Sequence, residues 1–159
     1  MKGTTGHLFA YGTLMSGEIM LAVTGSRFPA APGVLRGFRR NRIRGEVYPG
    51  IIPSLEERVD GILYRNLTED DWKRLDLFEG EMYVRSGVNV QLEDGTVGQA
   101  QTYVLKPQFE NRLSSEPWSL EEFLQSGRAR FESQYPGFAA LSGEMRKEGR
   151  NGKGGSCAG

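Results

Sequence analysis

One glutamate in the sequence has neighbours that would suit proton transfer. Glu79 follows Trp72 and Leu75 at positions i, i+3 and i+7 of a segment with helical periodicity, so the three side chains share one helix face. If that face turns towards the core, burial and the negative end of the helix dipole both raise the pKa of the Glu79 carboxyl. Such a carboxyl can accept and return a proton near neutral pH. The alternative is an exposed Glu79 with Phe78 completing the inward face, and periodicity alone favours it because most glutamates are solvated.

Polar residues just after this helix could bind a substrate. Period-two alternation places Tyr83 and Arg85 on a polar strand face and Val84 on the apolar one. Arginine offers a planar fork for a carboxylate and tyrosine offers a hydroxyl donor. One alternative is a solvent-facing polar strand face with an Arg–Glu surface pair. Another is a structural role, in which Arg85 pairs with Asp76 or with a backbone carbonyl.

A third candidate lies near the N-terminus. Tyr11-Gly12-Thr13-Leu14 joins an apolar strand to a helix, and Gly12 allows a sharp turn there. Backbone N–H groups between a strand end and a helix start can form an anion-binding nest. Ordinary strand–helix connections have the same pattern, so the loop alone decides nothing.

The elements that position these residues follow from periodicity and turn residues. We expect strands at residues 7–11, 33–37, 57–65, 82–92 and about 97–105, and helices at 17–24, about 69–79 and, in one or two pieces broken near Gly127, at 119–135. Thr68 is a good N-cap, and Asp94-Gly95 predicts a hairpin turn. Prolines at both ends of 48–53 exclude a central strand there, and Pro136 should end the last helix. Strands with inserted helices, lacking regular βαβ alternation, predict an α+β fold.

Composition narrows the function. The chain has 159 residues with 20 basic and 20 acidic side chains, so no net charge attracts nucleic acid or an anionic membrane. We expect one domain over residues 1–143 and a disordered tail over 144–159, which has almost no apolar residues. No apolar run is long enough to span a bilayer and no secretory signal is evident, so a cytoplasmic location is the expectation. One histidine and one cysteine cannot build an ordinary zinc site, and no phosphate-binding or nucleotide-binding glycine motif is present, so we expect no cofactor and no metal.

Five arginines lie close together in the first half of the chain. They could bind nucleic acid or phosphate, but little aromatic interleaving accompanies them and the net charge is zero. The simpler interpretation is a solvated arm near the pocket that helps to recognise an anionic substrate; these residues are Arg36, Arg39, Arg40, Arg42 and Arg44.

Together the motifs resemble those of the gamma-glutamylcyclotransferase-like family, especially its plant and bacterial branch named for avirulence-induced proteins. The loop resembles Y-G-T/S-L, and the glutamate region Leu75–Arg85 resembles L-D-x-F/Y-E-G-x-x-Y-x-R. Between them lie Tyr48-Pro49-Gly50-Ile51, which resembles Y-P-x-I, and Asp60–Tyr64, which resembles G-x-L/V-Y. The motifs occur in the family's order over roughly residues 7–105.

The resemblance implies a small mixed β-barrel of about five or six strands with flanking helices. It also implies that Glu79 is the acid/base and that the Tyr11–Leu14 loop holds the γ-glutamyl part of a small-molecule substrate, with Tyr83 and Arg85 as supporting binding residues. The implied reaction releases 5-oxoproline and an amine or amino acid. The alternative on the same fold is a non-catalytic protein that binds a small carboxylate metabolite.

Overall fold

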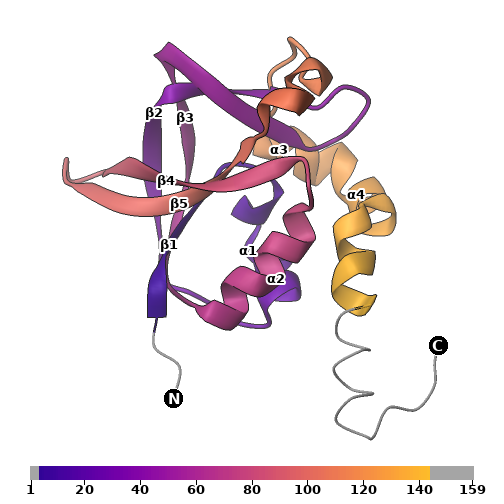
Figure 1. The fold of residues 1–159 in the computed structure, drawn as a ribbon, viewed down its shortest axis with the longest axis horizontal. Helices are drawn as coiled ribbons and strands as arrows, with labels where there is room; N and C mark the ends of the chain where they lie inside the picture. The colour runs from indigo at the N-terminus through magenta and orange to yellow at the C-terminus, as the bar shows by residue number, and fades with distance from the viewer. Residues whose placement is uncertain (1–3, 144–159) are drawn as a thin grey trace, which may run out of the picture.

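The computed structural model describes residues 4–143, which form five strands and several helices (Figure 1). The strands form a closed barrel in the order β1-β3-β2-β4-β5. Neighbours pair antiparallel except β1 and β5, which meet in parallel with Leu8 opposite Gln101. The bounds are Thr4–Ala10 for β1, Ala30–Arg42 for β2, Pro49–Thr68 for β3, Tyr83–Leu92 for β4 and Val97–Leu105 for β5.

Helices lie outside the barrel. A 3₁₀ turn, Thr13–Met15, follows β1 and leads into α1, Gly17–Thr24; α2, Glu69–Glu79, packs beside α1. After β5 come a second 3₁₀ turn, Pro107–Arg112, then α3, Leu120–Glu122, a π-helical turn, Phe123–Gly127, and α4, Arg128–Gln134. No helix within residues 4–143 combines the length and the apolar character needed to cross a bilayer.

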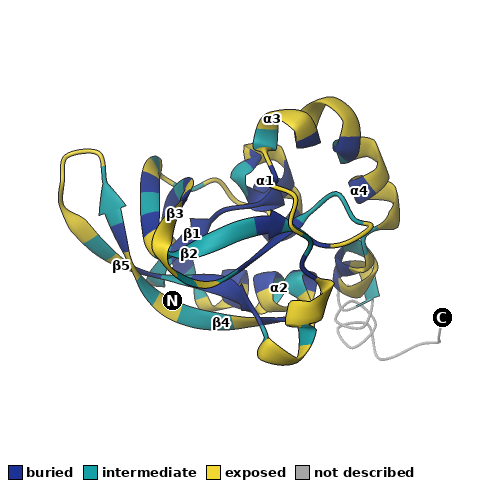
Figure 2. Cartoon of the chain, turned by 90° about the horizontal axis from the view of Figure 1, so that it is seen from above, coloured by how far each residue is buried: buried dark blue, intermediate teal, exposed yellow. Residues whose placement is uncertain are grey.

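Strand β1 separates two apolar cores by simple alternation. Phe9 and Tyr11 belong to the cluster that also contains Leu35 of β2, whereas Leu8 and Ala10 belong to the cluster with the apolar residues of α1 and α2. Figure 2 shows dark, buried residues along the strands and on parts of the helices, with exposed residues outside. The end of β1 therefore passes between both cores, which fixes the start of the following loop.

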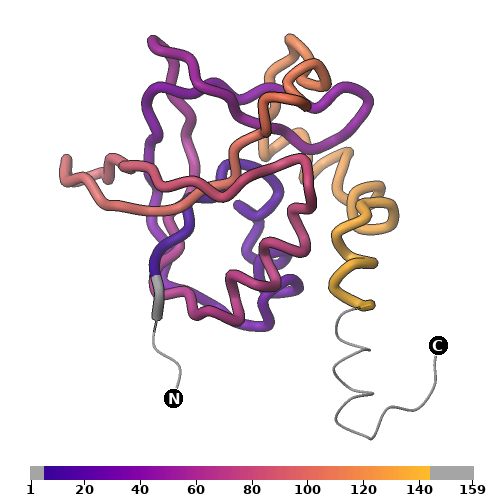
Figure 3. The backbone as a smooth tube through the Cα atoms, in the orientation of Figure 1, coloured from indigo at the N-terminus to yellow at the C-terminus, as the bar shows by residue number. Residues whose placement is uncertain are grey.

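Several local predictions are confirmed. Helix α1 covers residues 17–24 and ends at Gly25 in the left-handed conformation. Helix α2 begins with a capping box in which Thr68 and Asp71 satisfy each other's backbone N–H groups. It ends before Gly80, whose φ of 82° favours glycine. The β4–β5 hairpin turns at Asp94-Gly95 and extends beyond the rest of the barrel in Figure 3.

Three local predictions are wrong. Strand β3 was expected from residue 57 but begins at Pro49, and residues 49–53 pair with β2. The exclusion of a central strand there holds, because β1 meets β3 only at residues 62–68 and both prolines therefore lie where β3 has one partner. Helix α4 ends before Pro136 as expected, but it is not the last helix, since residues 136–143 are helical again after a break at Tyr135. At the start of β4, Val84 is exposed and Tyr83 is buried, the reverse of the faces expected for these two residues, although Val90 further along the strand is buried. The expected disordered tail, 144–159, lies outside the described residues.

Candidate active site

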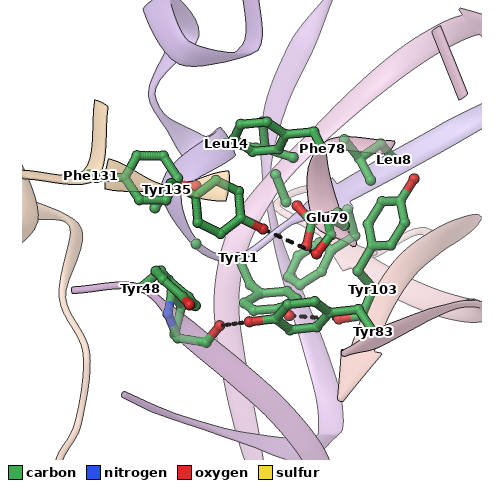
Figure 4. A pocket seen from close by; sticks show the side chains of 15 residues that line it. Leu8, Tyr11, Leu14, Tyr48, Phe78, Glu79, Tyr83, Tyr103, Phe131 and Tyr135 are labelled. Carbon is green, nitrogen blue, oxygen red and sulfur yellow. Dashed lines mark hydrogen bonds between the residues drawn. The ribbon is translucent and has the colours of Figure 1, made fainter. Parts of the chain in front are cut away.

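A pocket lies where the end of β1, the 3₁₀ turn after it and the C-terminal end of α2 meet (Figure 4). Its walls are mostly aromatic, and Glu79 carries the only charged side chain among the lining residues. The lining residues are Leu8, Phe9, Ala10, Tyr11, Gly12, Thr13, Leu14, Tyr48, Pro49, Phe78, Glu79, Tyr83, Tyr103, Phe131 and Tyr135.

Glu79 is the last residue of α2 and points into this pocket. The buried residues Trp72, Leu75 and Phe78 anchor the helix to the core. The inward face is thus the one that the alternative interpretation predicted, yet Glu79 also reaches the protein interior, because the helix ends there and the adjacent pocket accepts its side chain. Both sequence interpretations hold in part.

The Glu79 carboxyl has an unusual electrostatic environment. Burial raises its pKa from 4.5 to about 8, and the negative charge of Asp76 adds to the rise. Glu79 as a residue is half-buried, and loss of hydration at the carboxyl is the larger cause. Among the described residues no cation pairs with this carboxyl, and no donor hydrogen-bonds to it. The group therefore exists in both protonation states near neutral pH, as an acid/base residue must.

The tyrosine hydroxyls around the pocket donate to other acceptors. Tyr11 donates to the carbonyl oxygen of Tyr103 at 2.6 Å, and Tyr83 donates to that of Pro49 at 2.8 Å. Tyr135 donates to the backbone oxygen of Glu79 at 3.1 Å, a carbonyl left without a partner at the end of its helix. Burial raises the pKa of all these phenols, so they stay neutral. They form a weakly polar wall.

The predicted ligand loop offers hydrogen-bond donors on the same pocket. Gly12, Thr13 and Leu14 are buried, and none of the described residues accepts a hydrogen bond from their backbone N–H groups. A Cβ on Gly12 would lie 2.9 Å from the Cγ of Pro49, so glycine allows the close approach of these two segments. The amides start a helical turn, where N–H groups have no intrahelical partner and favour an anion.

Arg85 does not line the pocket. Its Nε lies 3.2 Å from Asp76 Oδ1, its Nη2 donates to Asp76 Oδ2 at 3.2 Å, and its guanidinium lies 4.6 Å from the centre of the Trp72 ring. Tyr103 donates to the same Asp76 carboxylate at 2.7 Å. The structure thus gives Arg85 the pairing with Asp76 that the sequence left as its alternative role, and Asp76 connects this cluster to Glu79 electrostatically.

The arginines of β2 are separated by their contacts. Arg40 donates from Nη1 to the backbone oxygens of Tyr11 at 2.8 Å and Asp60 at 3.0 Å, and lies over Trp118. Arg36 bonds to the side chain of Gln91, and Arg42 pairs with Glu116. Only Arg40 therefore supports the site, from behind the Tyr11–Leu14 loop.

The sequence did not identify the remaining aromatic wall. Tyr48 stood within a quoted motif without a role, and nothing near Tyr103, Phe131 or Tyr135 in the sequence signals a pocket, because tertiary packing brings them there. Within residues 4–143, no group of three or more histidine, cysteine or acidic side chains is placed to hold a metal ion.

Comparisons with known proteins identify the family and the fold. The family model described as gamma-glutamyl cyclotransferase, AIG2-like, matches residues 8–120. AIG2-like protein C of Arabidopsis thaliana is 36% identical over 125 residues, which cover 78% of this chain and 72% of that protein. An Arabidopsis thaliana protein solved in solution superimposes with a TM-score of 0.63 at 26% identity, covering 93% of this chain and 92% of the other. A solved gamma-glutamyl cyclotransferase shares the fold, with a TM-score of 0.55 at 20% identity over 65% of this chain and 73% of the other.

Fold and site define a small α+β protein with one half-buried carboxyl of raised pKa beside a loop of buried amides. The chain belongs to the AIG2-like gamma-glutamyl cyclotransferase family. The family and the α+β fold predicted from the motifs are confirmed.

Proposed function

We infer that this protein is a gamma-glutamyl cyclotransferase in which Glu79 is the only acid/base. The observation that carries the inference is an unpaired carboxyl with a pKa of about 8, enclosed in a pocket with free loop amides. A protein that only bound a carboxylate would gain from a cation in this place, whereas a proton shuttle requires a carboxyl that can take up and release a proton.

The geometry supports a reaction in two steps. Glu79 accepts a proton from the substrate's α-ammonium group, and the freed amine attacks the γ-carbonyl carbon of the same molecule, forming a five-membered ring. Glu79 then returns the proton to the leaving nitrogen as the amide C–N bond breaks. The ring nitrogen passes its remaining extra proton to the released amine, giving 5-oxoproline and the protonated amine. Because the attack is intramolecular, the protein needs to hold the substrate in its reactive conformation and does not need an activated nucleophile of its own. Well-oriented intramolecular reactions reach effective molarities on the order of 10⁵ M or more.

The other groups of the pocket support these steps. The amides of Gly12, Thr13 and Leu14 suit an anion, either the substrate α-carboxylate or the oxyanion that develops at the γ-carbonyl. Arg40 fixes the carbonyl of Tyr11 at the entrance to this loop. Tyr83 contributes a buried wall whose hydroxyl is already bonded to Pro49.

Product analysis by mass spectrometry tests the proposal. Wild type and Glu79→Gln are each incubated with γ-glutamyl amines, amino acids and peptides. We expect 5-oxoproline from wild type and a loss of at least about 100-fold in the variant, because general acid/base catalysis contributes that much or more. Activity that survives in Glu79→Gln would exclude the mechanism. If neither protein turns over but both are folded and bind members of the panel, the protein is a binder of small carboxylates instead.

A further inference from the structure

The mouth of the pocket is defined by three residues. Of the fifteen lining residues, twelve are buried, and the half-buried ones are Tyr48, Glu79 and Tyr135. A γ-glutamyl group bound at the buried loop amides therefore has its way out past these three side chains. The leaving amine, which stays attached to the γ-carbonyl until the last step, must lie in that exit.

Two tyrosine rings border this exit. The ring centres of Tyr48 and Tyr135 are 5.0 Å apart at an interplanar angle of 72°, an edge-to-face contact. Behind Tyr135, the ring of Phe131 stacks on the Tyr135 ring, with ring centres 4.6 Å apart and an interplanar angle of 22°. The ring centre of Phe78 lies 4.9 Å from that of Tyr135. The exit is thus bordered by aromatic surface with more rings behind it, and none of the lining residues is a cation that would bind an anionic leaving group.

Tyr135 comes from a part of the chain that the family model does not include. The model matches residues 8–120, whereas Phe131 belongs to α4 and Tyr135 follows it. Tyr135 has extended backbone angles, φ −68° and ψ 126°, between α4 and the helical residues 136–143. Its hydroxyl bonds to the backbone of Glu79, so the added segment is connected to the acid/base residue itself.

The pocket is narrow when empty. The cavity volume is about 30 Å³, and one water needs roughly 10–15 Å³ of cavity volume measured in this way. A γ-glutamyl compound is much larger, so Tyr48 and Tyr135 must give up part of their mutual contact when substrate enters. A ring on the substrate can replace the contact that is lost, while an aliphatic or charged group cannot.

We propose that Tyr48 and Tyr135 form an aromatic gate around the leaving amine, and that this gate makes the site prefer γ-glutamyl substrates with an aromatic leaving amine. The inference rests on the proposed function, since it takes the bound γ-glutamyl group as its starting point. It assigns a role in substrate choice to a segment outside the family match. Edge-to-face and stacked ring contacts contribute about a 3- to 10-fold preference beyond the area that they bury.

Two substrates of matched size test the gate. L-γ-glutamyl-2-phenylethylamide and L-γ-glutamyl-2-cyclohexylethylamide differ in aromaticity at the same position, and the measured quantity is the ratio of their kcat/KM values. We expect wild type to favour the phenyl compound by about 3- to 10-fold, with the ratio falling towards one in Tyr135→Leu and in Tyr48→Leu. Tyr135→Phe keeps the ring but loses the hydrogen bond to the backbone of Glu79. The ratio of the two kcat/KM values should therefore stay at its wild-type value while kcat falls. The ratio does not depend on the fraction of enzyme that is folded.

Phe138→Leu is the matched control. Phe138 packs 5.5 Å from Phe131 and 6.3 Å from Tyr135 but does not line the pocket, so this variant should keep the wild-type ratio. A wild-type ratio of one, or one that both leucine variants at the gate leave unchanged, overturns the gate and leaves the cyclotransferase proposal standing. If wild type cleaves neither compound, their binding is measured by calorimetry. Tighter binding of the phenyl compound by wild type, with this preference lost in Tyr135→Leu, supports the gate alone. Equal binding of the two compounds, or no binding, overturns the gate.

Discussion

Replacing Glu79 by glutamine should make the free energy of unfolding of the protein less sensitive to alkaline pH. The carboxyl has a pKa of about 8 in the folded protein against 4.5 for the ordinary group. Between these values the folded state holds a proton that the unfolded state has released, so stability falls as pH rises through this window. Glutamine has nearly the same shape and carries no such proton, so the variant lacks this loss.

The size of the effect follows from the two pKa values. With 1.36 kcal/mol for each pKa unit, and with partial ionisation at both ends, wild type should lose about 4 kcal/mol more than Glu79→Gln between about pH 5 and about pH 9. Contributions from the other titrating groups are common to both proteins and cancel in the difference. Urea denaturation followed by tryptophan fluorescence at a series of pH values measures it.

Glu81→Gln is the control, because it removes an exposed carboxyl two residues away and should follow wild type. A difference between wild type and Glu79→Gln that stays constant within about 1 kcal/mol over this range would show that the Glu79 carboxyl is hydrated in the folded protein. Such a result would refute both the electrostatic argument and the proton shuttle that rests on it. An NMR titration of the Glu79 side-chain carbon gives the folded-state pKa directly.

Two further predictions concern the residues behind the site. Asp76→Asn removes the negative charge that adds to the raised pKa of Glu79. The acidic limb of the pH profile of kcat/KM, expected near pH 8 in wild type, should therefore move to lower pH in this variant. A limb that stays in place would show that burial alone sets the pKa of Glu79. Arg40→Met leaves the carbonyls of Tyr11 and Asp60 without their donor and should lower the free energy of unfolding by about 1–3 kcal/mol. Arg39→Met, one residue away and without such bonds, should stay near wild type in the same urea titration.

The sequence predicted most of the fold because local rules decide it. Thr68, Gly25 and Gly80 set helix ends through hydrogen bonding and backbone conformation, and Asp94-Gly95 sets a turn, so single residues were enough. The start of β3 was missed because prolines exclude only a strand paired on both sides, and the sequence does not show how many partners a strand has. Tyr83 was assigned to the wrong face because period-two alternation grouped it with the polar residues of β4, whereas the carbonyl of Pro49 supplies a buried acceptor for its hydroxyl.

Parts of the site were predictable where a single segment shows the residue and its local position. The loop amides and Glu79 each follow from their own element, and both line the same pocket. Arg85 was grouped with them on spacing, although its fork could serve a carboxylate of the protein as well as one of a substrate, and Asp76 lies within reach. Tyr103 and Tyr135 could not be found from the sequence, because each reaches the pocket only through contacts between distant parts of the chain.

The position of Glu79 at the end of its helix explains why periodicity could not decide its role. A glutamate one turn earlier on the same face would lie against the apolar core, where ionisation would cost stability without any access for substrate. One turn later, it would lie beyond Gly80 and outside the helix. At the last helical residue the main chain is still held by Trp72, Leu75 and Phe78, while the side chain extends past the core into a space that Tyr48 and Tyr135 close. At that position the carboxyl is buried enough for its pKa to rise and open enough for a substrate to reach it. Helical periodicity sorts residues into buried and exposed faces, so it cannot identify a residue that is partly both.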